Sequence, residues 1–262
     1  MLNLSRKNKR LLDLLVIIAL VLISIPITIY GEVSFLTSTL LFFGLPSAYL
    51  IYKRPRNFKK ALYAGVILGL ILGFSFDFVA EFNNSWGWGS DFALPVNLFG
   101  VVSLDVLVWF FFWVFLAVAY YEYFVENDRS TKISKNAKWV TFWGLILAVV
   151  TVLLWKVYPQ ILELTNAYAK LGTITFIITA VLLYKQPKLI PKVLQLIPFF
   201  AFMYLAYEIT ALHMNLWTFP GTYLGLVSVG DIAFPLEELI VWIFASSAIV
   251  ATYYEFVIDD ER

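Results

Sequence analysis

The chain has 262 residues and a formal net charge of +1, and 61% of its residues are hydrophobic while 14% are charged. This composition leaves too little polar surface for a soluble globular protein, and it predicts a membrane protein without a nucleic-acid partner. The absence of cysteine excludes disulfides, thiolate metal sites and a cysteine nucleophile, and the single histidine, His213, argues against a histidine-ligated metal centre. We therefore expect neither a metal nor a cofactor.

Several apolar runs of the chain are long enough to cross the hydrocarbon layer of a membrane, which takes about 17 to 25 residues in a helix. In chain order they lie near 11–30, 34–52, 61–81, 102–124, 138–158, 169–185, 192–212 and 232–257. Backbone polar groups in lipid must be satisfied within each segment, and no run alternates with the period that a barrel needs. The sequence thus predicts an all-α fold, a polytopic membrane helix bundle of about eight transmembrane helices.

Basic residues gather before the first run and between the second and third, the fourth and fifth, and the sixth and seventh runs. The positive-inside rule places these segments and both termini on the cytoplasmic side of the cell membrane. The apolar run after the basic N-terminus lacks a convincing small-residue cleavage site. We therefore interpret it as a retained first span.

The chain carries one pattern twice, in residues 1–130 and again in residues 131–262. Each half places an acid nine residues before a tryptophan and another acid four residues before a second tryptophan, in the pairs Asp77 and Trp86, Asp105 and Trp109, Glu208 and Trp217, and Glu238 and Trp242. An acid at the centre of a membrane helix costs about 2.5–3.5 kcal/mol, so acids at matching places indicate function. We predict two parallel four-helix repeats related by an axis along the membrane normal, with these four acids near the outer helix ends and converging in one cavity.

Glycines along the third run indicate which way its acid points. Gly65, Gly69, Gly73 and Asp77 follow one another at every fourth position and therefore share one helix face. Small residues at this spacing let helices approach closely. We expect this stripe to pack against protein, so that Asp77 points into the bundle.

Acids and aromatic rings in a membrane suit one kind of chemistry. A carboxyl group in an apolar pocket stays protonated because desolvation penalises its charged form, and it can then act as a proton donor. The face of an aromatic ring attracts cations. Together these groups supply the proton donor and the cation-stabilising rings that carbocation chemistry on an alkene requires.

The second half also contains a recognisable order of residues. Glu208 is followed by Trp217-Thr218-Phe219 and then by Pro235-Leu236-Glu237-Glu238 at the start of an apolar run. This order resembles the paired domains of the integral-membrane lycopene cyclases of archaea, some bacteria and fungi. The first half departs from it, because Val102-Ser103-Leu104-Asp105 stands where Pro-x-Glu-Glu is expected.

The resemblance implies a carotenoid-synthesis enzyme whose substrate is lycopene, or another long apolar polyene with ψ end groups, taken from the bilayer. It implies a net isomerisation without redox change, and no dinucleotide fingerprint of the Gly-x-Gly-x-x-Gly type is present. Association with other carotenoid enzymes or with a second copy of the chain is an expected partnership. The expected substrate-binding residues are aromatic: Trp86, Trp88, Trp109, Trp113, Trp217, Phe219 and Trp242.

We hypothesise that a protonated carboxyl group, Glu238 or Glu237, donates a proton to C2 of the terminal double bond and leaves a tertiary cation at C1. The C5–C6 double bond then closes the ring, neighbouring rings stabilise the cation at C5, and a carboxylate removes a proton from C6. The carboxylates considered for this last step are Asp105, Glu208 and Asp77.

Other interpretations stay open. Water that reached the cation would make the protein an end-group hydratase, and a polar pocket would suit a membrane terpene cyclase that acts on a prenylated head group. Parallel repeats with intramembrane acids also describe proton-coupled transporters. Trp86, Trp88 and Trp217 also suit an interfacial aromatic belt, and we expect the segment 120–124 to form such a belt at the cytoplasmic end.

Overall fold

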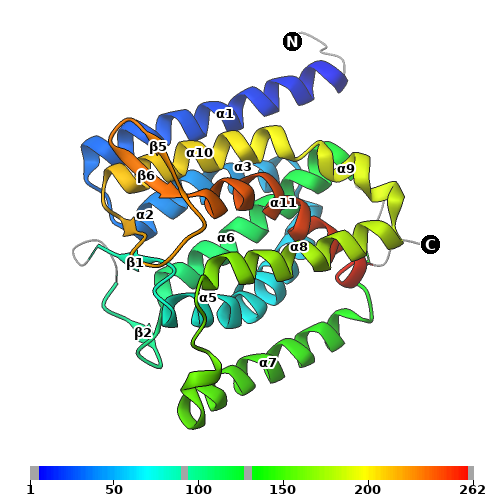
Figure 1. Cartoon of the computed structure of the whole chain (residues 1–262). Coiled ribbons are helices and arrows are strands. Elements are labelled where there is room, and N and C mark those ends of the chain that lie inside the picture. Colours follow the sequence, from blue (N-terminus) through cyan, green and yellow to red (C-terminus); the bar gives the residue numbers. More distant parts are fainter. Residues whose placement is uncertain (1–5, 90–93, 127–131, 259–262) are drawn as a thin grey trace.

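The computed structural model describes residues 6–89, 94–126 and 132–258, which fold mainly into helices that run back and forth between two ends of the molecule (Figure 1). The helices of the first half are α1 (Arg6–Gly31), α2 (Phe35–Thr39), α3 (Leu45–Lys53), α4 (Phe58–Ala64), α5 (Gly73–Phe82) and α6 (Leu104–Tyr120). π-Helical segments η1 (Leu40–Gly44), η3 (Gly65–Leu72) and η4 (Tyr121–Glu126) join or extend them, and the short 3-10 helix η2 (Pro55–Asn57) precedes α4.

The second half is also mainly helical. Its helices are α7 (Ala137–Val157), α8 (Ala167–Lys185), α9 (Ile190–Leu194), α10 (Ile197–His213) and α11 (Leu236–Phe256), with 3-10 turns η5 (Pro159–Ile161) and η6 (Pro187–Leu189). The start of α1 and the end of α11 lie at the same end of the molecule (Figure 1).

The described part of the chain contains six helices that are long and apolar enough to cross a membrane, or seven if a bent pair counts as one span. The bent pair is Pro187–Leu194 with Ile197–His213, at an angle of 47°. Pro198 has no N–H to donate to the carbonyl of Leu194, four residues earlier, so it explains the break between α9 and α10. The eighth expected run corresponds to α11, which has 21 residues. The described residues therefore form a helical bundle with six or seven candidate membrane-spanning helices, where the sequence predicts about eight.

The expectation of an all-α fold is incomplete, because short strands lie in the connections at one end of the bundle (Figure 1). They form three antiparallel ribbons: β1 (Gly87–Trp88) with β4 (Trp217–Thr218), β2 (Asn97–Leu98) with β3 (Val102–Ser103), and β5 (Leu226–Val229) with β6 (Ile232–Pro235). The ribbon of β1 and β4 joins the two halves, with Trp88 opposite Trp217. Strands this short have too little alternation to be recognised in the sequence.

The glycine stripe packs against protein, as predicted, and the structure shows that its partner is α6. A Cβ atom added at Gly65 would lie 2.8 Å from the Phe111 ring, and one at Gly69 would lie 2.8 Å from the Phe110 carbonyl oxygen. Only glycine allows the two backbones to approach this closely. Asp77, at the end of the stripe, is fully buried, so it points into the bundle as expected.

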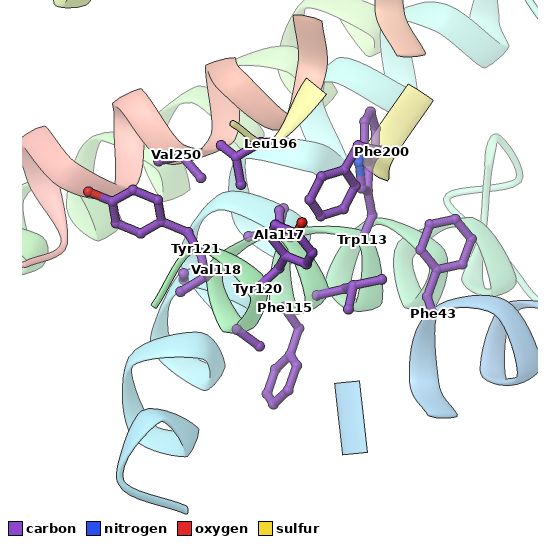
Figure 2. Packing of buried hydrophobic residues seen from close by; sticks show 14 of the residues in the cluster. Phe43, Trp113, Phe115, Ala117, Val118, Tyr120, Tyr121, Leu196, Phe200 and Val250 are labelled. Atoms are coloured by element: carbon purple, nitrogen blue, oxygen red, sulfur yellow. The ribbon is translucent and has the colours of Figure 1, made fainter. Parts of the chain in front are cut away.

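The main apolar core surrounds α6. Figure 2 shows its side chains packed against other helices: Trp113, Phe115, Ala117, Val118, Tyr120 and Tyr121 of the α6–η4 segment, with Phe43, Leu196, Phe200 and Val250. The Tyr120 ring stacks on Phe199 with 4.6 Å between ring centroids. The segment 120–124 therefore belongs to the core, and the belt interpretation is wrong for its buried members Tyr120 and Tyr121.

An ion pair is buried at the C-terminal end of α6, where η4 begins. Lys60 Nζ lies 2.5 Å from Glu122 Oε2, and the side chains are 3% and 0% exposed. The Tyr253 hydroxyl donates to the other oxygen, Glu122 Oε1, at 2.6 Å. This network ties α4, η4 and α11 together, so Glu122 is an interior residue and not the surface anchor expected from the sequence.

Candidate active site

Two acids and two tryptophans form matching hydrogen bonds at the strand-bearing end of the bundle. The Trp86 Nε1 group donates to Asp77 Oδ1 at 3.1 Å, and the Trp217 Nε1 group donates to Glu208 Oε1 at 3.1 Å. The nine-residue spacing found in the sequence therefore corresponds to a side-chain hydrogen bond. This bond joins an acid in the last turns of a helix to a tryptophan in the turn that follows.

The turn after each helix explains why this spacing works. Asn84 follows α5 with φ 54°, and Asn215 follows α10 with φ 51°. Asparagine tolerates this left-handed conformation, which ends a helix and reverses the chain. The next backbone N–H then bonds back to the helix, from Ser85 to the Ala80 carbonyl and from Leu216 to the Ala211 carbonyl, both at 2.9 Å. Each tryptophan is thereby folded back toward its acid.

The second pair of matching acids is Asp105 and Glu237. Asp105 Oδ2 accepts the Leu94 N–H at 2.7 Å, and Glu237 Oε1 accepts the Leu224 N–H at 2.8 Å. Each acid is the second residue of its helix, α6 or α11. In its hydrogen bonding Asp105 therefore resembles Glu237, whereas in its distance to the following tryptophan it matches Glu238.

A large cavity lies among the helices and has a volume of about 1760 Å³. Residues of α5, α6, α7, α8, α10 and α11 line it, and most of them are apolar. Sites for drug-sized ligands measure roughly 300–1,000 Å³. This cavity is therefore large enough for a long apolar molecule.

The predicted acids divide into two groups around this cavity. Glu208, Glu237 and Glu238 line it. Asp77 and Asp105 are fully buried and have no accessible surface, so they contribute none to the cavity. The expectation that Asp77, Asp105, Glu208 and Glu238 converge in one cavity is wrong for the two aspartates, which hold Trp86 and the loop at Leu94 in place instead.

The predicted aromatic residues lie around the same space. The cavity lining includes Trp86, Trp88, Trp109, Trp113, Trp217 and Phe219. The Trp109 ring lies 4.6 Å from Trp113 and 5.9 Å from Trp217 between centroids, so the rings from the two halves meet. Trp217 is 7% exposed, which excludes a place in an outward-facing belt. The side chain of Trp242 lies outside the described part of the structure.

Tyr168 is a member of this site that sequence reasoning missed. It belongs to the first turn of α8, is 3% exposed and lines the cavity. Its hydroxyl forms a side-chain hydrogen bond with Glu238, and its ring meets Trp86 edge-on at 5.4 Å. Tyrosine at the start of a predicted span suggests only an interfacial anchor. Tyr168 also lies outside the duplicated acid–tryptophan segments, so no signal in the chain marks it.

The loops of the two halves are tied together beside the site. The Tyr223 hydroxyl donates to the Ser85 carbonyl at 2.9 Å and accepts the Gly221 N–H at 2.8 Å. Burial raises the pKa of Tyr223 to about 12, so the hydroxyl keeps its proton at neutral pH. Tyr223 lies near the acid-bearing end of the cavity, because it interacts electrostatically with Glu237 and Glu238.

The arrangement places three carboxyl groups, of Glu208, Glu237 and Glu238, and the Tyr168 hydroxyl beside one mostly apolar cavity. Glu208 lies close enough to Glu238 for the two carboxyl groups to interact electrostatically. Tyr168 interacts electrostatically with both of them and with Glu237. Comparisons with models of protein families, with curated proteins and with solved structures found no match.

Proposed function

We propose that the protein is an integral-membrane polyene cyclase that closes the ψ end groups of lycopene or a related polyene without redox change. One observation carries the proposal: three glutamates, Glu208, Glu237 and Glu238, line one end of a large apolar cavity walled by tryptophans. The order of these residues, which resembles the lycopene cyclases, supports the same chemistry.

In the proposed reaction, Glu238 donates its proton to C2 of the terminal double bond and leaves the tertiary cation at C1. Glu238 is preferred over Glu237 because Glu237 Oε1 accepts the Leu224 N–H, and a hydrogen bond from a backbone amide stabilises the charged form of that carboxyl group. The electron pair of the C5–C6 double bond then forms the C1–C6 bond, which moves the cation to C5.

Glu208 is the preferred base for the last step. It shares the cavity with Glu238, whereas Asp77 and Asp105 have no accessible surface. Removal of a proton from C6 forms the ring double bond, so one proton enters, one leaves and the product is an isomer. Trp109 and Trp217 line the cavity, and a desolvated ring face stabilises a cation by about 2 kcal/mol or more.

The two halves of the chain, 1–130 and 131–262, are proposed to be parallel four-helix repeats. The matching hydrogen bonds of the Asp77–Trp86 and Glu208–Trp217 pairs support this organisation. The antiparallel ribbon of β1 and β4 supports it too, because such a ribbon has local two-fold symmetry and joins the halves. Only the second half then keeps its acids in the cavity.

The proposed location is the cell membrane with both termini cytoplasmic, which rests on the basic segments between spans. The proposed substrate enters from the bilayer. Association with other carotenoid enzymes or with a second copy of the chain belongs to the same proposal.

The test is expression of the full chain in cells that accumulate lycopene, followed by chromatography of the carotenoids. Monocyclic or bicyclic carotene is the expected product. Unchanged lycopene would refute the proposal, and a hydroxylated polyene would replace it with the hydratase alternative. Glu238→Gln should abolish conversion while the protein still inserts, and Glu163→Gln, at an exposed position outside the site, is the matched control.

A further inference from the structure

The cavity follows α11 along nearly its whole length. Its lining includes Glu237 and Glu238 in the first turn of this helix and Glu255 near its end. At about 1.5 Å per residue, the stretch from Glu238 to Glu255 spans roughly 26 Å. The hydrocarbon core of a bilayer is about 30 Å thick, so the cavity is nearly as long as the membrane is deep.

The two ends of this cavity differ in chemistry. Among the described lining residues, three acids, Glu208, Glu237 and Glu238, lie at the end that carries the strands, together with Tyr168. At the opposite end the lining contains one acid, Glu255, whose Oε2 accepts a hydrogen bond from the Gln186 side chain. A proton donor beside a proton acceptor is therefore present at one end only of the described cavity.

We infer that the substrate is a long chain that lies extended along α11, with one end group at the Glu208–Glu238 cluster. The length of the cavity then limits the length of the substrate, and one end group reacts in each binding event. This inference rests on the proposed cyclase function and adds the orientation and the length of the substrate. A bicyclic product then requires release of the monocyclic molecule and rebinding in the opposite direction.

Small side chains keep the cavity open between its two ends. Ala245 and Ala248 of α11 and Gly172 of α8 all line it. A Cβ atom at Gly172 would meet nothing within 4 Å. Ala248 lies roughly 15 Å along the helix from Glu238, which is more than half of the way to Glu255. A large side chain at this position would shorten the space available to the substrate without touching the acids.

The first experiment compares lycopene with a shorter homologue that carries the same ψ end groups, using the full chain in lipid nanodiscs. Ala248→Trp should lower the initial rate with lycopene by roughly ten- to hundredfold, because a small displacement of the reacting end suffices for such a loss. The rate with the shorter polyene should stay within about twofold of the unsubstituted protein, since its tail does not reach the new ring. Activity on the shorter polyene also shows that the variant is folded.

Val149→Trp is the matched control, because Val149 is 58% exposed on α7 and the substitution adds the same ring outside the cavity. This control should leave both rates unchanged. Equal losses for the two polyenes in Ala248→Trp would overturn the length inference while the cyclase proposal stands. Absence of cyclisation of either polyene by the unsubstituted protein would refute the cyclase proposal itself.

The second experiment needs no substitution. Labelled lycopene is converted briefly, and a large excess of unlabelled lycopene is then added. Release between the two ring closures predicts that labelled monocyclic product accumulates and that little label proceeds to the bicyclic product. Labelled bicyclic product that forms without a lag and is insensitive to the added lycopene would show that both ends react in one encounter, and the inference would fail.

Discussion

The indole Nε1 of Trp217 donates a hydrogen bond to Glu208 Oε1 at 3.1 Å, and this contact fixes one cavity-lining acid from the turn that follows its own helix. The equivalent contact between Trp86 and Asp77 has the same length but holds an acid without accessible surface. One hydrogen-bonding pattern therefore serves two purposes, one in the site and one in the scaffold behind it.

This division predicts opposite outcomes for two conservative substitutions. Glu208→Gln removes the proposed base and should lower turnover about a hundredfold or more. Asp77→Asn keeps an oxygen that accepts the Trp86 N–H, so its turnover should stay within about threefold of the unsubstituted protein. Initial rates with lycopene in nanodiscs measure both effects. A loss of similar size in Asp77→Asn would show that the first half contributes to the chemistry.

Tyr168 is predicted to position Glu238. Tyr168→Phe keeps the ring against Trp86 but removes the hydroxyl that bonds to the carboxyl group. Loss of one such bond should lower kcat about tenfold. KM should change little, because the shape of the cavity is preserved. A rise in KM with an unchanged kcat would indicate that Tyr168 contacts the substrate instead of orienting the acid.

The buried pair of Lys60 and Glu122 is predicted to hold the other end of the bundle. Removing one partner, as in Lys60→Met, leaves an uncompensated buried charge and should cost about 3–5 kcal/mol. The double substitution Lys60→Met with Glu122→Gln should recover part of this loss, since no unpaired charge then remains. Thermal unfolding in detergent compares the two variants with the unsubstituted protein. Equal unfolding temperatures for Lys60→Met and the unsubstituted protein would argue against a structural ion pair.

Two glycine substitutions test how closely η3 and α6 approach. Gly69→Ala would place a Cβ 2.8 Å from backbone atoms of Phe110 and Phe111, and it should destabilise the protein by about 1–3 kcal/mol. Gly172→Ala has open space around the new atom and a better helix former, so it should stabilise by up to about 1 kcal/mol. The order of the unfolding temperatures distinguishes the two cases, and the reverse order would contradict the packing of η3 on α6.

Tyr223→Phe should loosen the contact between the loops. Without the hydroxyl, neither the Ser85 carbonyl nor the Gly221 N–H keeps its partner, and water gains access to the acid-bearing end. The predicted result is a higher ratio of hydroxylated to cyclised product in chromatography.

The pH dependence of this bridge follows from the raised pKa of Tyr223, about 12. The free phenol has a pKa of about 10, so the contribution of the bridge to stability is fully present below that pH and is lost as the pH rises toward 12. A stability curve that falls through this range, and no longer does so in Tyr223→Phe, would bear out the assignment. Identical curves for the two proteins would contradict it.

Local features of the chain were predictable from its sequence. Apolar runs predicted the membrane helices, because burial in lipid leaves a helix as the way to satisfy the backbone of such a segment. The fourfold glycine spacing predicted the packing face of the third span, and this is confirmed by the contacts with Phe110 and Phe111. The nine-residue interval between Glu208 and Trp217 was visible as well, since both residues belong to one helix and its turn.

Contacts between distant segments were decided by the tertiary structure alone. The packing of the helices placed Glu122 in the interior, removed Asp77 and Asp105 from the cavity and brought Tyr168 of α8 to Glu238 of α11. Periodicity in a sequence shows which residues share a helix face. It does not show which helix that face meets, because this choice depends on how all the helices pack together.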